Sequence, residues 1–225
     1  MTNTITDNLQ FENGNRMNGL SKEQRVQQLV PLLRKVLELL GEDPERKGLQ
    51  RTPERWAEAL LTYTQGTAAS PEDHLRVIFE MDDDDYPVGS DDMIIVDNIH
   101  FTSTCEHHMA PFRGTAHVAY IPNPQSRIVT GLSKISRVVT LFARRLQIQE
   151  RMTQQIARAI DDHLEPLGVI AVVQAAHFCM IQRGVEQRES TTITTARRGV
   201  FLTKPQLETR FLEYLRMQDG KPDVL

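Results

Sequence analysis

Hydrophobic positions first recur with a helical period after residue 20. They fall at intervals of three and four residues from Val26 to Leu40, and the pattern stops at Gly41. Such spacing is typical of one apolar face of an α-helix. Ser21 followed by Gln24 fits a capping box, so the pattern predicts an amphipathic helix that begins at Ser21.

The segments on either side of this helix carry other patterns. Residues 1–20 have few large apolar side chains, and we predict a disordered tail because such a segment cannot offset its ordering entropy. A second helix is expected from Thr52 to Gly66, since Thr is a common cap and Pro53 suits the first turn. Asp82 to Asp85 fall in an expected acidic loop, because no calcium-loop spacing accompanies them. Residues 21–91 are therefore predicted to form a helical region with an acidic connection.

From residue 92 onward, β-branched runs alternate with helical patterns. The predicted elements are strands over residues 93–102, 114–121, 169–182 and 191–202, and helices over 133–145, 149–164 and from 204 onward. Ser133 is the expected cap of the first of these helices. The order of the core elements, β, β, α, α, β, β, indicates an α+β domain over residues 92–225 that ends in a helix.

Composition and charge narrow the class of protein. The chain has 225 residues, of which 40% are hydrophobic and 25% charged, enough for one substantial core with an appendage. The formal net charge of -4 argues against a general nucleic-acid binder. The sequence has neither a run of about 18 apolar residues nor a secretory signal pattern, so we predict a cytoplasmic protein without a membrane partner.

Candidate metal ligands lie just after one predicted strand and within another. Cys105 and His108 are three positions apart, a spacing at which one tight loop can turn both side chains toward one metal ion. Cys179 is the only other cysteine in the sequence. Three protein ligands with an open fourth position are typical of a catalytic zinc. A pair of small buried hydrophobes, a disulfide and a purely structural zinc remain alternatives at this point.

Two further histidines flank these ligands. His107 precedes His108, and His177 lies two positions before Cys179, on the same face if both residues are in an extended strand. An imidazole beside a metal-activated water is a common proton donor or acceptor near neutral pH, although a hydrogen-bonded core histidine is an equally ordinary role. We expect both histidines to act in acid-base catalysis.

Charged and amide residues suggest a nucleotide. Lys134 and Arg137 share a face near a predicted helix N-terminus, which suits a phosphate chain, although a solvated charged face is the commoner explanation of such a pair. Gln149 and Glu150 open the next predicted helix. In a pocket, a carboxylate beside an amide can bind the donor groups and the carbonyl of a guanine edge.

Several motifs together resemble one enzyme family. They are Ser-Thr-Cys-Glu-His-His at 103–108, Val-Ala-Tyr-Ile-Pro at 118–122, Gly-Leu-Ser-Lys-Ile at 131–135, Gln-Ile-Gln-Glu-Arg-Met-Thr at 147–153, and His-Phe-Cys-Met at 177–180 followed by Arg-Gly at 183–184. From about residue 25 to its C-terminus, the chain resembles GTP cyclohydrolase I. The tail before residue 25 is where the resemblance ends.

The resemblance implies a tunnelling fold (T-fold) and a specific reaction. In this family each subunit contributes an antiparallel four-stranded sheet with two helices, and subunits join edge to edge into a toroidal homo-oligomer, a decamer of two stacked pentamers with active sites between subunits. Zinc-dependent hydrolysis and rearrangement of GTP would give 7,8-dihydroneopterin triphosphate and formate, the first step of tetrahydrofolate and pterin biosynthesis. The alternatives are another T-fold enzyme that acts on a pterin or deazaguanine, and a zinc-stabilised assembly protein that binds nucleotide without chemistry.

The resemblance also implies roles for individual residues. The zinc ligands would be Cys105, His108 and Cys179, the acid-base histidines His107 and His177, and the guanine-recognition pair Gln149 and Glu150. The ribose and triphosphate contacts would be Ser133, Lys134, Arg137 and Arg183, with Arg55 supplied by a neighbouring subunit.

Overall fold

The computed structural model describes residues 19–80 and 91–218. Nearly all of the predicted tail, and the whole run from Asp82 to Asp85, lie outside these residues. The chain forms two compact units, one of residues up to 62 with 67–69, the other of residues 63–66 with 70 onward. The predicted divisions 1–20, 21–91 and 92–225 stay predictions.

The first unit contains two helices, as its periodicity predicts. Helix α1 spans Lys22–Leu39, and α2 spans Thr52–Tyr63 and runs into the second unit. The capping box is confirmed: Ser21 Oγ accepts from Gln24 N at 3.2 Å, and Gln24 Oε1 accepts from Ser21 N at 2.8 Å. Both backbone amides would otherwise lack a partner at the start of the helix.

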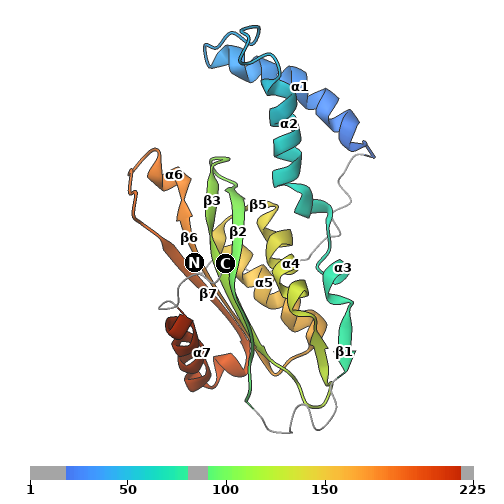
Figure 1. Cartoon of the computed structure of the whole chain (residues 1–225), viewed down its shortest axis with the longest axis vertical. Helices are drawn as coiled ribbons and strands as arrows, with labels where there is room; N and C mark the ends of the chain where they lie inside the picture. The colour runs from blue at the N-terminus through green and yellow to red at the C-terminus, as the bar shows by residue number, and fades with distance from the viewer. Residues whose placement is uncertain (1–18, 81–90, 219–225) are drawn as a thin grey trace, which may run out of the picture. The chain divides into compact units, whose positions relative to one another are not determined.

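The second unit is built on one twisted sheet (Figure 1). Its strands are β2 (Ile94–Cys105), β3 (Pro111–Ile121), β5 (Leu146–Gln147), β6 (Gly168–His177) and β7 (Thr192–Gly199), in the order β5-β2-β3-β6-β7. The four predicted strands pair antiparallel, whereas the two-residue β5 pairs parallel with β2 and was not predicted. A separate ribbon pairs β1 (Ile78–Glu80) with β4 (Ile128–Thr130). The α+β order predicted from the sequence is confirmed.

Two helices cover one face of this sheet. Helix α4 (Leu132–Ala143) packs against β2, and α5 (Gln149–Leu164) packs against β6 and β7. Their buried side chains recur at helical spacing and include Ile135, Val138, Val139 and Phe142 from α4 and Met152, Ile156, Ile160 and Leu164 from α5. None of the described helices is long and apolar enough to cross a lipid bilayer.

The predicted cap of α4 is wrong. The helix begins at Leu132 behind Gly131, whose backbone is extended and which offers no side chain to cap the helix. Ser133 therefore lies inside the first turn, and its side chain is exposed. The Gly131 carbonyl instead accepts from Lys134 N at 2.8 Å. This leaves the Ser133 hydroxyl available to a ligand.

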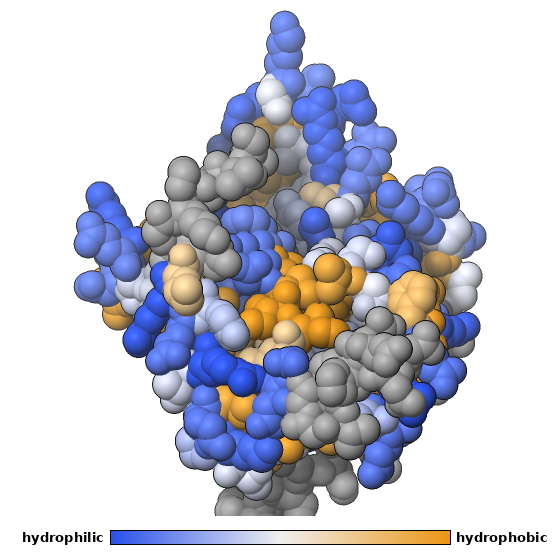
Figure 2. All heavy atoms as spheres, turned by 60° about the horizontal axis from the view of Figure 1, so that its bottom comes forward, coloured by the Kyte–Doolittle hydropathy of each residue, from blue (hydrophilic) through white to orange (hydrophobic). Residues whose placement is uncertain are grey.

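The opposite face of the sheet is covered only in part. Helix α7 (Pro205–Gln218) and the 3-10 turn η2 (Val200–Leu202) cover its lower half in Figure 1. Their contact is a hydrophobic cluster of Ala119, Ile121, Ile170, Val172, Phe201, Leu207 and Phe211. Figure 2 looks onto this end of the molecule and shows hydrophobic side chains gathered among hydrophilic ones.

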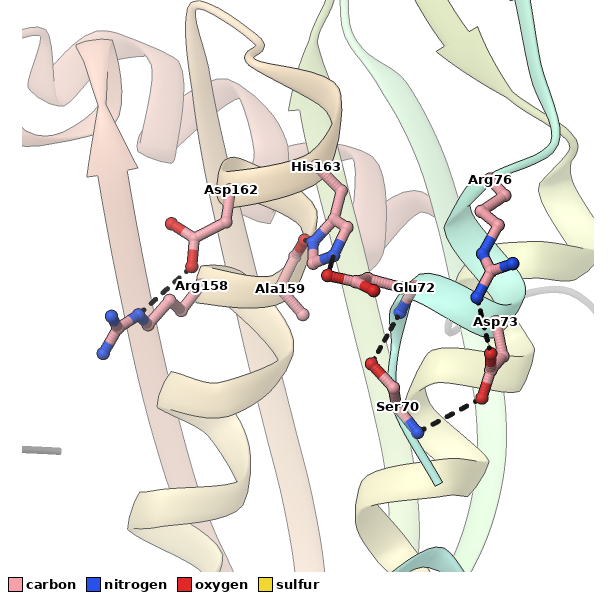
Figure 3. A network of polar contacts seen from close by, with 8 residues as sticks. All are labelled: Ser70, Glu72, Asp73, Arg76, Arg158, Ala159, Asp162 and His163. Atoms are coloured by element: carbon pink, nitrogen blue, oxygen red, sulfur yellow. Dashed lines mark hydrogen bonds and ion pairs between the residues drawn. The ribbon is translucent and has the colours of Figure 1, made fainter. Parts of the chain in front are cut away.

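A polar network joins the short helix α3 (Glu72–Leu75) to the end of α5 (Figure 3). His163 donates through Nδ1 to the Ala159 carbonyl at 2.7 Å, and its Nε2 lies 3.8 Å from Glu72 Oε1. Ser70 Oγ accepts from Glu72 N at 3.3 Å. These contacts hold the chain that leads into β1 beside the C-terminal end of α5.

Gly114 lies where the backbone of β6 leaves no room for a side chain on β3, and we expect its replacement by alanine to destabilise the sheet. A Cβ at this position would lie 1.8 Å from the Gln174 carbonyl oxygen, so the two strands would have to separate. Gly114→Ala should lower the free energy of unfolding by about 3 kcal/mol. Urea unfolding at a fixed protomer concentration measures the change.

Gly131→Ala is the matched control for this substitution. The nearest atoms to a Cβ at Gly131 are 3.8 Å away, which is ordinary van der Waals contact. Its cost should be about 1 kcal/mol or less, from the weaker helix cap. Equal unfolding midpoints for the two variants would contradict the close approach of β3 and β6.

Candidate metal centre and active site

A tight loop between β2 and β3 brings Cys105 and His108 together. Cys105 is the last residue of β2, and its carbonyl accepts from Met109 N at 2.9 Å and from His108 N at 3.4 Å. Met109 takes a left-handed backbone conformation with φ of 54°, which closes the loop. Cys105 Sγ and His108 Nδ1 lie 3.8 Å apart. That separation suits two ligands roughly 2.3 Å and 2.0 Å from one zinc ion.

Cys179 reaches the same place from a short helix, not from a strand. Strand β6 ends at His177, opposite Phe112, and residues Phe178–Ile181 form helix α6. The predicted strand to residue 182 is therefore wrong, and so is the expectation that His177 and Cys179 share one face of a strand. The physical reason is that β3 begins at Pro111, so β6 has no partner strand beyond His177.

The three predicted metal ligands form one cluster. One ligand atom each of Cys105, His108 and Cys179 lies within 4.8 Å of the other two. Cys105 is buried, Cys179 half-buried and His108 exposed, so the cluster lies where the interior meets the surface. Both cysteines are free thiols, which does not support the disulfide alternative.

The chemistry of this donor set fits a divalent cation. Burial raises the pKa of the Cys179 thiol, and the neighbouring Cys105 raises it further, while Arg183 acts in the opposite direction. Two adjacent thiols therefore resist becoming thiolates together. A bound dication removes that obstacle, because coordination deprotonates thiols and the two negative charges balance the charge of the ion.

His177 is held beside the cluster by two different contacts. Its Nε2 lies 2.7 Å from Gln149 Oε1, and its ring stacks on Phe112 with centroids 4.7 Å apart and planes 4° from parallel. Burial lowers the pKa of His177, and the carboxylate of Glu150 partly offsets this effect. The predicted acid-base histidine is thus a fixed and half-buried imidazole.

An ion pair fixes the loop that carries the ligands. Glu106 accepts two hydrogen bonds from the guanidinium of Arg151, at 2.6 Å and 2.8 Å, and Arg151 lies in the first turn of α5. The backbone adds a second link, since Glu106 N donates to the Gln147 carbonyl at 3.0 Å. His107 follows directly, with an exposed side chain and its Nε2 4.0 Å from Glu106 Oε1.

The predicted substrate residues lie on helices α2, α4 and α5 and in the turn after α6. Glu150 raises the pKa of His177, and Arg183 lowers the pKa of the Cys179 thiol, so each lies within electrostatic reach of one of these two side chains. Ser133, Lys134 and Arg137 lie on α4, where none of them is fully buried, and Arg55 is exposed on α2 in the first unit. Within the described part of the second unit, no hydrogen bond or ion pair joins the three α4 residues to Cys105, His108 or Cys179.

Residues 27–216 match the sequence profile of one family, described as GTP cyclohydrolase I. The chain belongs to the GTP cyclohydrolase I family. It is 50% identical over 185 residues to GTP cyclohydrolase 1 of Porphyromonas gingivalis, covering 82% of this chain and 91% of that one. It is 44% identical over 186 residues to GTP cyclohydrolase 1 of Clostridium kluyveri, covering 83% and 95% of the two chains. The resemblance found in the motifs is confirmed.

One solved structure gives a much weaker likeness. The archaeosine synthase QueF-Like in its apo form aligns with a TM-score of 0.40 at 14% identity, covering 49% of this chain and 96% of that one. A likeness at this level does not bear on the fold or the function.

Two parts of this family member's site were missed in the sequence. The partners Glu106 and Arg151 are 45 positions apart, and Phe112 and His177 are 65 apart, so no local spacing indicates either contact. The available signal was opposite charge: Glu106 lies within one of the motifs and Arg151 within another. Charge alone does not specify a partner, because many exposed charged residues could satisfy it.

We expect the Glu106–Arg151 ion pair to strengthen metal binding by holding the ligand loop in place. Replacing Arg151 by methionine keeps a long apolar stem but leaves Glu106 without its two charged hydrogen bonds. Zinc affinity should fall by about tenfold, the lower end of what is usual for groups that orient metal ligands. Competition with a chromophoric chelator measures the change.

Arg158→Met is the matched control for Arg151→Met. Arg158 lies about two turns further along α5 and pairs with Asp162 at 3.2 Å. This variant should bind zinc as the unaltered chain does. If Arg151→Met did so as well, the ion pair would have no part in organising the metal site.

Proposed function

We propose that this chain catalyses the zinc-dependent conversion of GTP to 7,8-dihydroneopterin triphosphate and formate, which feeds tetrahydrofolate and pterin biosynthesis. The observation that supports this most directly is the cluster of Cys105, His108 and Cys179 within a chain that matches the GTP cyclohydrolase I family over residues 27–216. Three ligands leave a coordination position for water, which is typical of catalytic zinc.

The three metal ligands and the two neighbouring histidines have distinct tasks in this proposal. Cys105, His108 and Cys179 hold the zinc ion, which when bound makes a water molecule nucleophilic near neutral pH. His177 and His107 move protons to and from the substrate. His177 is the better placed of the two to do so at a fixed position, because Gln149 and Phe112 restrain its ring.

The substrate is held at both ends. We assign the guanine end to Glu150, whose exposed carboxylate can accept two donors from the base. Gln149 was predicted to share this task, and that contact stays a prediction which the hydrogen bonds of its buried side chain do not favour. The ribose and triphosphate are assigned to Ser133, Lys134, Arg137 and Arg183, with Arg55 of a neighbouring subunit.

Assembly into a ring, a decamer of two stacked pentamers, is part of the same proposal. Strand β7 forms one edge of the sheet, and on the other side β5 pairs only with Thr104 and Cys105 of β2. Open edges of this kind favour pairing with a further strand, and ring closure would supply one. The cytoplasmic location stays a prediction.

Incubation of the purified protein with GTP tests the function. We expect formate together with 7,8-dihydroneopterin triphosphate, detected by the fluorescence of its oxidised pterin. Both products should disappear when zinc is chelated and return when zinc is restored, because nucleophilic water depends on the ion. Size-exclusion chromatography with light scattering, run on the same samples, reports the assembly with and without zinc.

The two alternatives give other results in this experiment. A T-fold enzyme specific for a pterin or deazaguanine would leave GTP unchanged and release no formate. A zinc-stabilised assembly protein would bind GTP without turnover and would fall apart on chelation. In the proposed enzyme, chelation abolishes turnover while the assembly survives.

A further inference from the structure

The side chain of Gln149 is buried and fully engaged in hydrogen bonds. It is 1% exposed, and its Nε2 lies 2.9 Å from the Val173 carbonyl, 3.0 Å from the Thr192 carbonyl and 3.1 Å from Thr194 Oγ1. Its Oε1 lies 2.7 Å from Nε2 of His177. A single amide thus joins the first turn of α5 to β6, to β7 and to the histidine.

The partners of this amide determine which of its ends faces His177. Two of them are backbone carbonyls, which only accept hydrogen bonds, so the NH₂ group must point toward them. The opposite orientation would set a carbonyl oxygen against two others. The amide oxygen therefore faces His177, and because that oxygen only accepts, Nε2 of His177 carries a proton.

Nδ1, the second ring nitrogen of His177, differs from Nε2 in that it carries no proton in the neutral ring. The stack on Phe112 restrains the tilt of the ring, and the bond to Gln149 restrains its rotation in the plane. Within the described residues Nδ1 has no hydrogen-bond partner. In a neutral ring whose Nε2 is protonated, Nδ1 holds the free lone pair.

We propose that Gln149 is a positioning residue which fixes the orientation of the His177 ring and holds it as the Nε2–H tautomer. The tautomer follows from contacts within this chain, whereas its use in the reaction rests on the proposed function.

This role differs from direct recognition of guanine by Gln149. To reach the base, the amide would have to leave two buried carbonyls and the His177 imidazole without their partner, which is costly for buried polar groups. Its neighbour Glu150 is exposed and would not have to break buried hydrogen bonds in order to contact the base. The two adjacent residues therefore act on different partners, one on the substrate and one on a histidine.

Magic-angle-spinning NMR of the zinc-loaded, ¹⁵N-histidine-labelled protein tests the tautomer without any substrate. The His177 signals are assigned by their loss in a His177→Gln variant. We expect neutral His177 to show a protonated Nε2 and an unprotonated Nδ1. A proton on Nδ1 of the neutral ring would overturn the proposal, whether or not the protein turns over GTP.

Steady-state kinetics of Gln149→Leu test the role in turnover. Leucine has a similar volume but accepts no hydrogen bond, so His177 loses its restraint in the plane of the ring. We expect kcat to fall by about tenfold or more with KM for GTP little changed, as for other groups that orient a catalytic side chain. An unchanged kcat, or a raised KM with kcat kept, would overturn the proposal; the second result would restore Gln149 as a guanine contact.

Thr194→Val is the matched control. It removes one acceptor of the Gln149 NH₂ group, together with the 2.6 Å bond to Thr153, but leaves both carbonyls and the bond to His177 in place. Its kcat should stay within about twofold of the unaltered chain. A loss as large as that of Gln149→Leu would show that loosening of the sheet, rather than His177, is responsible, and would overturn the proposal. If Gln149→Leu failed to fold, the NMR measurement on the unaltered chain would still decide.

Failure of this proposal is distinguishable from failure of the proposed function. A zinc-loaded protein with the expected tautomer but no formate from GTP would contradict the function alone. Normal formate release with the opposite tautomer would contradict only the role of Gln149.

Discussion

The register of β3 against β6 is the constraint on which the rest of the site depends. Antiparallel pairing sets Phe112 opposite His177 at one end of the two strands and Ile121 opposite Gly168 at the other. The first pair brings the loop after β2 and the turn after β6 into contact, although they lie about 70 positions apart in the sequence. A slip by one residue would turn the His177 side chain to the other face of the sheet and separate the thiols.

Helix α5 packs against the sheet and carries several residues of the site in its first turn. Its buried face forms the core beneath the sheet, so its first turn is anchored by packing as well as by hydrogen bonds. Three consecutive residues of this turn meet three different environments: Gln149 lies inside the sheet network, Glu150 faces outward and Arg151 holds the ligand loop through Glu106. A rigid element thus positions the residues proposed for metal, proton and base, which favours precise geometry.

The sequence predicted those features whose cause is local. Helix α5 has the expected bounds, Gln149–Leu164, because its apolar positions repeat over more than four turns, and the capping box of α1 depends on two residues three positions apart. The predictions of secondary structure failed where an element depends on residues far away in the sequence. The strand assigned to Cys179 ends early because its partner strand does, and β1, β4 and β5 are too short to show a period without their partners.

In the candidate site, too, features with a local cause were predicted and those that depend on distant residues were not. Cysteine and histidine at short spacing indicated Cys105 and His108, the cysteine count added Cys179, and the family motifs agreed with all three. The contacts that orient them were hidden, because the partners of Gln149 include backbone carbonyls, which no side-chain motif records. Glu106 and Arg151 were visible as residues but not as a pair. The assembly proposed from the resemblance depends on surfaces of other copies, and the open sheet edges of one chain do not specify how many copies join.

The junction between β5 and α5 has a consequence for how this enzyme family can vary. Only Ile148 separates the strand pair Cys105–Gln147 from the first helical residue. An inserted or deleted residue here would rotate the start of α5 by about 100° and present a different side chain to His177. We therefore expect the site to tolerate a different side chain at position 148 better than a change in the number of residues between Gln147 and Gln149.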